Sequence, residues 1–448
     1  MRTESACQSQ TRPWSRYSFY MVLGLALLVI LSGALLFYWR SCVGPRYQTL
    51  LSPGHSLTIV RRPAPSTFGK GPLNALPSYD PSVTEAFQVD LRGADLSGLD
   101  VQDRQEDLLH AAFDDRTLWP ESLPLDFDPK RLMELGRNPG LQVRELHQQG
   151  ITGKGIGIGI IDQTLLVEHV EYRDRLRLYE EIHNSGYEAT MHSAAISSIA
   201  VGKTVGVAPG ADLYYIANTH GNWRVAGGFH PDFMWTAQSI ERLLAINRML
   251  PDERKIRVIS ISVGWTKGKG CDEANAAVQK ARKENVFVIS TSLESTYGLA
   301  FHGLGRDPLK DPDKPESYGP GSWWRERFFA APERRVKVER LMVPMDSRCV
   351  ASPAGADQYV FYASGGWSWA VPYLAGLYAL ACQVKPTITP EEFWALGLRT
   401  AKTIAVERDG KAYPFGMIVD PVAMVRVLTE GGPVGSNPAD SMSPANER

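Results

Sequence analysis

The sequence has few cysteines and no excess of charge of either sign. The five cysteines include no Cys-x-x-Cys pair, so their spacing indicates neither a disulfide framework nor a zinc site. The 48 Lys and Arg residues nearly balance the 49 Asp and Glu residues, which gives no electrostatic reason to expect nucleic acid as a partner. The zinc-protease pattern His-Glu-x-x-His is also absent. We therefore expect no cofactor and no metal site.

Long apolar runs are scarce too, and the single exception lies near the N-terminus. Residues 19–38, FYMVLGLALLVILSGALLFY, carry no charge and would form a helix long enough to cross about 30 Å of hydrocarbon. Arg12, Arg16 and Arg40 bracket the run, and no A-x-A cleavage site follows it. The pattern favours an uncleaved transmembrane anchor at 19–39 over a signal peptide. The basic residues before it predict a single-pass protein of the cell membrane whose main domain is extracytoplasmic.

Composition divides the rest of the chain. With 44% hydrophobic and 22% charged residues, most of it is expected to be globular. The segment rich in Pro, Gly and Ser that follows the anchor is typical of a stalk, and the small polar residues at the C-terminus are typical of a disordered tail. The predicted order is a short N-terminal segment (1–18), the anchor (19–39), the stalk (40–80), an irregular pre-domain segment (81–137), the main domain (138–430) and the tail (431–448).

Within the main domain, apolar strands alternate with amphipathic helices. This alternation predicts an α/β fold with a mainly parallel sheet and helices on both faces. Ligand sites in such sheets lie beyond the carboxyl ends of the strands. A long irregular insertion is expected from 295 to 340. The predicted strands are 156–161, 258–263 and 286–289, and the predicted helices are 233–250 and 272–284.

Three polar residues lie at element boundaries of this domain. Asp162 directly follows the first strand, His192 begins a helix of small residues, and Ser368 stands between two glycines and an apolar helix. Each residue alone is more often structural, as a helix cap or a buried histidine. The residues around them carry more information than any one of the three.

Residues 140 to 401 resemble the subtilisin-like serine proteases. GKGIGIGIIDQTLLVEHVEY, MHSAAISSIAVG and GGWSWAVPYLAG are similar to the aspartate, histidine and serine motifs of that family, and GVAPGA is similar to the segment that follows its histidine helix. The resemblance implies a three-layer subtilisin-like fold and a triad of Asp162, His192 and Ser368. It also implies that Ser262, Val263 and Gly264 pair with the extended backbone of a peptide or protein substrate.

The sequence departs from the family pattern at several positions. Trp367 and Trp369 flank the serine in place of Thr and Met. The strand VFVIS is followed by TSLES, which lacks the family's oxyanion asparagine; the register puts that position near Leu293 and Glu294. We predict a hydroxyl as the substitute donor, that of Ser292 in preference to that of Thr291.

Two functions stay open. One is a membrane-anchored serine endopeptidase that acts through an acyl-enzyme. The other is a pseudoprotease, a membrane-tethered binding or regulatory domain. His169, His183, Glu180 and Glu181 can be arranged as a metal site on paper, but a solvated helix face is expected there.

Overall fold

The computed structural model describes residues 58–184, 186–224, 228–330 and 339–431. They belong to one compact unit, Leu57–Arg448. The predicted anchor at 19–39, the first part of the predicted stalk and the tail from 432 onwards lie outside the described residues. Within the described ranges, no helix combines the length and apolar character that crossing a membrane requires.

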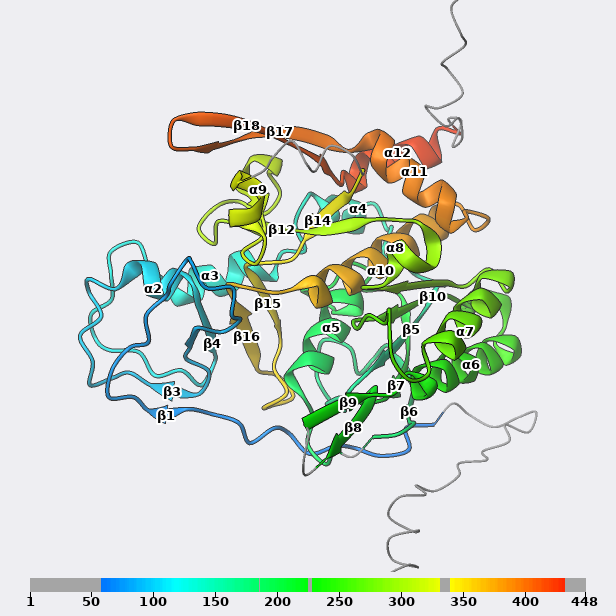
Figure 1. The fold of residues 1–448 in the computed structure, drawn as a ribbon, viewed down its shortest axis with the longest axis horizontal. Helices are drawn as coiled ribbons and strands as arrows, with labels where there is room; N and C mark the ends of the chain where they lie inside the picture. Colours follow the sequence, from blue (N-terminus) through cyan, green and yellow to red (C-terminus); the bar gives the residue numbers. More distant parts are fainter. Residues whose placement is uncertain (1–57, 185, 225–227, 331–338, 432–448) are drawn as a thin grey trace, which may run out of the picture. The chain divides into compact units, whose positions relative to one another are not determined.

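A five-stranded parallel sheet forms the centre of this unit (Figure 1). The predicted strands lie within about two residues of their observed bounds, and the aspartate is the last residue of its strand rather than the first residue after it. Every neighbouring pair runs parallel, so all carboxyl ends meet at one edge. The strand order is β11 (Phe287–Ser290), β10 (Ile256–Ile261), β5 (Gly157–Asp162), β7 (Asp212–Ala217) and β6 (Leu176–Glu181).

Helices cover both faces of this sheet, which confirms the predicted α/β arrangement. On one face, α6 (Met234–Met249) and α7 (Cys271–Lys283) pack together, and α6 contacts β5 and β10. A Cβ on Gly159 would stand 2.8 Å from a methyl of Leu243 in α6, so this close packing requires glycine in β5. On the other face lie α5 (Met191–Val201) and α10 (Trp367–Val384).

Residues 295–340, which we expected to form an irregular insertion, contribute strands to a second sheet. Part of that insertion folds into two strands that pair with each other and with strands from the C-terminal part of the chain. The prolines and glycines of the insertion misled the prediction, because they interrupt the alternating pattern of both strands. The strand order is β13 (Tyr318–Pro320), β12 (Phe301–Arg306), β14 (Leu341–Pro344), β18 (Lys411–Ile418) and β17 (Lys402–Arg408).

Residues 81–137, the predicted pre-domain segment, contribute to a third sheet. Strand β4 (Ala111–Asp114) pairs antiparallel with β16 (Tyr359–Tyr362), which leads into the serine motif. The order is β15 (Arg348–Ala351), β16, β4 and β2 (Val89–Asp90). Helix α3 (Pro129–Arg137) contacts β15 and β16, and apolar residues of both chain regions share one buried cluster.

Residues 58–80, which fall within the predicted stalk, lie against the body of the protein. The N–H of Val60 donates to Tyr179 O (3.0 Å), and Arg61 forms an ion pair with Glu181 (2.6 Å). Further along, the N–H of Ser66 donates to Pro353 O (2.8 Å). A stalk could therefore comprise only residues before 58, which lie outside the described chain.

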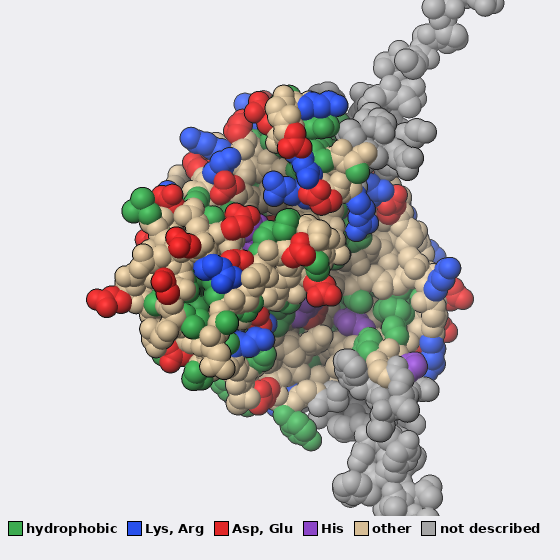
Figure 2. Space-filling model, turned by 60° about the vertical axis from the view of Figure 1, so that its left-hand side comes forward, with side chains coloured by type: hydrophobic (Ala, Val, Ile, Leu, Met, Phe, Trp, Pro, Cys, Tyr) green, Lys and Arg blue, Asp and Glu red, His purple; other side chains and the backbone are tan. Residues whose placement is uncertain are grey.

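The remaining elements are short or peripheral. On the face drawn in Figure 2, acidic and basic side chains are interspersed. The remaining strands are β1 (Gly71–Pro72), β3 (Ala94–Asp95), β8 (Gly221–Arg224) and β9 (Gly228–Pro231), and the remaining helices are α2 (Gln105–Leu109), α4 (Val143–Gln148), α8 (Leu293–Tyr297), α9 (Arg325–Ala330), α11 (Pro390–Thr400), α12 (Pro421–Thr429), η1 (Asp252–Arg254) and η2 (Pro315–Ser317).

Candidate active site

The structure brings Asp162 and His192 into direct contact at the carboxyl edge of the central sheet. Asp162 is the last residue of β5, and His192 is the second residue of α5, whose N-cap is Thr190. The carboxylate Oδ1 lies 2.8 Å from Nδ1 of the imidazole and also accepts the N–H of Gln163 at 2.8 Å. Such a bond fixes the tautomer in which Nε2 is free to accept a proton.

Burial and mutual attraction act on this pair in opposite directions. Burial would raise the pKa of Asp162, but the adjacent imidazole outweighs it and holds that pKa below its ordinary value. Burial would likewise lower the pKa of His192, and the carboxylate more than offsets this and raises it. About a quarter of the imidazole (24%) stays exposed. His192 is therefore an accessible imidazole whose basicity a buried carboxylate increases.

Ser368 lies at the second position of α10, after Gly366, whose φ of +135° favours glycine. Its backbone N–H falls in the first helical turn, where no intrahelical acceptor exists. Among the hydrogen bonds of the described residues, its Oγ donates to Ser262 O (3.2 Å) and not to His192. Hydrogen bonds of catalytic groups are often absent or long without substrate and form only in the complex.

The predicted substrate segment follows β10 and contacts the serine directly. The Ser262 hydroxyl donates to Ser368 O at 2.8 Å, so two hydrogen bonds join these serines. Val263 and Gly264 are half-buried, and within the described chain their backbone groups make no hydrogen bond. A Cβ on Gly264 would approach Thr291 Oγ1 to 2.5 Å. This segment offers free backbone groups next to Ser368.

The end of β11 differs in character from the end of β5. Leu293, at the register of the missing asparagine, is fully buried. The Ser292 hydroxyl is occupied, because it accepts the N–H of Trp265 at 2.6 Å and donates to Trp265 O at 2.9 Å. Ser292 could therefore donate to an oxyanion only by giving up the bond to that carbonyl. Its proposed role stays a prediction.

Two further residues lie next to the pair, Trp369, which the sequence already places beside the serine, and His220, which was not identified from the sequence. Trp369 lies edge-on to the imidazole of His192, with ring centroids 6.0 Å apart. His220 is buried, its Nδ1 lies 2.9 Å from Thr236 Oγ1, and its Nε2 has no partner within the described part of the chain. Burial lowers the pKa of His220 to about 4, so it is neutral at pH 7. The parallel register of β5 and β7 could have indicated it, because residues just after β7 must lie beside Asp162.

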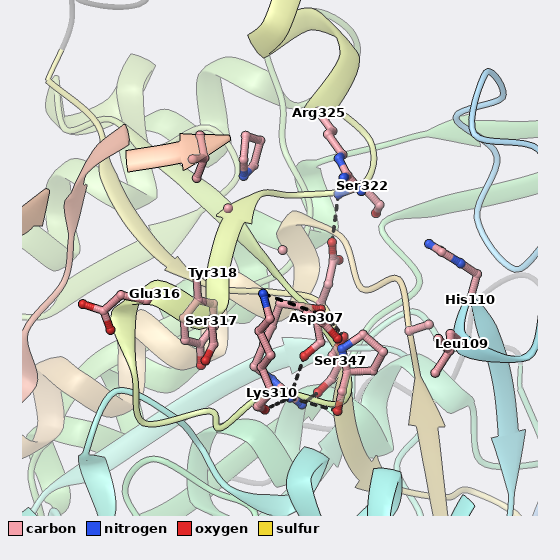
Figure 3. Close-up of a pocket in the computed structure, with 18 of the residues that line it drawn as sticks. Leu109, His110, Asp307, Lys310, Glu316, Ser317, Tyr318, Ser322, Arg325 and Ser347 are labelled. Atoms are coloured by element: carbon pink, nitrogen blue, oxygen red, sulfur yellow. Dashed lines mark hydrogen bonds and ion pairs between the residues drawn. The ribbon is translucent and has the colours of Figure 1, made fainter. Parts of the chain in front are cut away.

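A buried carboxylate supports the loop before the serine. Asp346 accepts the N–H of Gly365 and the N–H of Ser322, both at 2.8 Å. Burial raises its pKa to about 6. A cavity of about 520 Å³ adjoins it, with Ser322 and Arg325 on one side and Asp307 and Lys310 on another (Figure 3). Asp346 thus ties the serine loop to the insertion.

The side chains that could be drawn as a metal site serve other contacts. His169 is buried with Nε2 2.8 Å from Gln358 O. Glu180 pairs with Arg242 and Glu181 with Arg61. Across the described residues, no cluster of three or more His, Cys, Asp or Glu could hold a metal ion.

The chain is similar to a solved structure and to the model of one protein family. One solved structure with a similar fold is that of the prenylagaramide maturation protease PagA; it shares 15% identity and a TM-score of 0.44 over 65% of this chain and 99% of that chain. A likeness this distant carries no argument about function. Residues 153–323 match the model of the subtilase family. That stretch contains Asp162, His192 and Ser262–Gly264 and ends before Ser368. A match to this family over residues 153–323 supports a serine-type peptidase.

Proposed function

We propose that the protein is a serine endopeptidase that hydrolyses peptide bonds through Asp162, His192 and Ser368. The observation that carries the proposal is the 2.8 Å contact between the Asp162 carboxylate and the His192 imidazole. It lies at the edge of the sheet where the segment after β10 holds Ser368. The subtilase match over residues 153–323 supports the same chemistry.

The roles follow from the positions of the groups. Ser368 Oγ attacks the acyl carbon while His192 Nε2 takes its proton, and the imidazolium then protonates the leaving amine. Asp162 stabilises that imidazolium and keeps Nδ1 protonated. The Ser368 N–H, in the first turn of α10, donates to the oxyanion. Water then hydrolyses the acyl-enzyme with His192 again as the base.

A fluorophosphonate probe tests this function, because only an activated serine reacts with it. We expect the full-length protein to be labelled at Ser368 and to cleave casein. Ser368→Ala should abolish both while circular dichroism stays unchanged, since the members of a triad act as a unit. Ser262→Ala leaves the nucleophile in place and serves as the comparison for local packing. Labelling that survives Ser368→Ala would overturn the assignment.

One observation favours a second function, a pseudoprotease that binds partners without turnover. The register position of the oxyanion asparagine holds the buried Leu293, and the neighbouring Ser292 hydroxyl already bonds the backbone. A full-length protein that binds peptides but neither reacts with the probe nor cleaves casein would support this function.

We also propose that the domain is tethered to the cell membrane outside the cytoplasm. The support is the uncharged run at 19–38 and the basic residues before it. Protease added to intact cells should digest the domain, whereas a cytoplasmic control protein survives. Protection of the domain until the membrane is permeabilised would reverse the topology.

A further inference from the structure

A second cavity, of about 680 Å³, opens next to the catalytic histidine. Met191 and Thr190, which directly precede His192, form one wall. The N-terminal segment supplies another wall with Phe68, and β16 supplies a third with Tyr362. This volume falls within the range of pockets that bind small molecules or side chains. We call it the β16 pocket.

The β16 pocket is connected to the triad through aromatic contacts. The ring of Tyr362 lies 5.5 Å from that of Trp369, and Trp369 in turn lies 6.0 Å from the imidazole of His192. Trp369 is also the residue after Ser368. Neither Trp369 nor His192 lines the pocket, so a group seated there would be linked to the imidazole through these rings and through the adjoining Thr190 and Met191.

The position relative to Ser368 indicates which part of the substrate reaches the pocket. Ser368 contacts Ser262 on the side where the acyl portion of a peptide is proposed to pair. The pocket lies on the side of Trp369 and Tyr362, and none of its lining residues comes from β10 or the segment after it. A substrate residue that reaches the pocket therefore lies away from the segment after β10, with which the acyl portion is proposed to pair.

The chemistry of the walls favours an apolar group. Phe68 and Tyr187, which are 45% and 86% exposed, lie together in the lining of the pocket. The two guanidinium groups of the lining already have carboxylate partners, Arg92 with Asp90 and Arg116 with Asp114. An anionic ligand would have to displace one of these ion pairs.

An aromatic side chain fits best. The guanidinium of Arg92 lies 4.7 Å from the centroid of Phe68 and 5.6 Å from that of Tyr362. A further ring placed between these groups would gain aromatic contacts and the same cation–π attraction. We propose that the β16 pocket binds an aromatic or large aliphatic side chain of the substrate on the leaving-group side of the scissile bond. The inference rests on the proposed peptidase function.

The test uses the full-length protein and internally quenched peptides that differ at one of the three positions after the scissile bond. Each position carries Phe, Leu, Gly, Lys or Asp, and mass spectrometry locates the cleavage. We expect Phe or Leu to exceed Gly at least tenfold in kcat/KM at one position, because apolar groups in a pocket are worth about 10- to 200-fold. A ratio below about threefold at all three positions would overturn the inference.

Substitutions in the β16 pocket test whether the pocket causes the preference for apolar side chains. Ala354 lines it and is partly exposed, so Ala354→Trp should fill it, and Phe68→Ala should remove one wall. Both should reduce the Phe-to-Gly ratio to below about threefold. Leu125→Ala truncates an apolar side chain of the same N-terminal segment that is 99% exposed and outside the pocket, and should keep the ratio. An unchanged ratio in both pocket variants would refute the assignment.

A binding measurement distinguishes failure of this inference from failure of the proposed function. The Ser368→Ala protein is mixed with a fluorescein-labelled peptide carrying Phe at the preferred position, or at each position in turn if the wild type cleaves nothing. Binding that Ala354→Trp weakens at least tenfold supports the pocket even if the enzyme proves inactive. Equal binding to both proteins contradicts it.

Discussion

The carboxyl ends of β5 and β11, which both border the candidate site, differ in polarity. At the end of β5, Asp162 and His192 keep a buried polar contact at 2.8 Å, although burying a carboxylate is costly without such a partner. At the end of β11, Leu293 is apolar and fully buried, and Ser292 satisfies the backbone of Trp265. The first end holds the polar contact that the proposed proton transfer requires, whereas the second end is filled by packing.

The largest expected effect on kcat comes from changing the Asp162–His192 contact at the end of β5. Asp162→Asn should lower kcat by about 10⁴, because an amide stabilises the wrong imidazole tautomer while preserving shape. Steady-state turnover of a peptide substrate measures it. Asp212→Asn changes a buried carboxylate at the opposite end of the sheet, where it pairs with Arg177, and should leave kcat within about threefold. Equal losses in both variants would show that Asp162 acts through folding alone.

A smaller effect on kcat is expected from introducing an asparagine at the apolar end of β11. Leu293→Asn should raise kcat at least tenfold over Leu293→Ala, since one oxyanion donor is worth about 10²–10³ in turnover. The alanine variant loses similar packing without gaining a donor, so the ratio isolates the amide. If the two variants are equally slow, Leu293 does not occupy the donor position, and another group fills that role.

A third prediction concerns the stability of the same region. Ser292→Ala leaves the buried N–H of Trp265 without its acceptor and should lower the free energy of unfolding by about 1–3 kcal/mol. Ser260→Ala, in β10, removes a buried hydroxyl that has no partner among the described residues, and should change it by less than about 0.5 kcal/mol. Urea titration measures both. A tenfold fall in kcat of folded Ser292→Ala would support the oxyanion role predicted from the sequence.

The smallest expected effect is a shift in pH dependence. The base must be neutral to act, and the Asp162 carboxylate raises the pKa of His192 above 6.5, so probe labelling should fall as the pH drops through a value above 6.5. In Asp162→Asn only burial remains, which lowers the pKa of His192, so the slow residual labelling should persist to lower pH. If labelling of the wild type and of Asp162→Asn falls over the same acidic pH range, the Asp162–His192 pair does not set the pKa of the base.

The parallel sheet and its helices could be predicted because long periodic runs carry a strong signal. Residues 256–261 and 271–283 show it clearly, and the observed bounds agree with the prediction within about two residues. Strands β12 and β13 were not predicted, because glycine and proline interrupt the alternation in FHGLGR and YGP. The β17–β18 hairpin was also missed, although its two strands are adjacent in the chain and pair with each other.

The polar residues of the site were found through motif resemblance, and the contacts around them were not. His220 depends on the register between β5 and β7, and Trp369 reaches His192 only because α10 packs on α5. The occupied state of the Ser292 hydroxyl depends on Trp265, a residue of another loop. Such properties arise from tertiary packing, which no local pattern encodes.

The pairing of the N-terminal segment with β16 also has a consequence for the order of folding. The N–H of Tyr359 bonds Asp115 across 244 residues of chain, and contacts of such long range form slowly because loop closure costs entropy. During synthesis the region of Asp162 and His192 emerges long before β16 and Ser368. In the proposed peptidase, a growing chain therefore holds its base before its nucleophile, and hydrolysis can begin only after the two distant regions have joined.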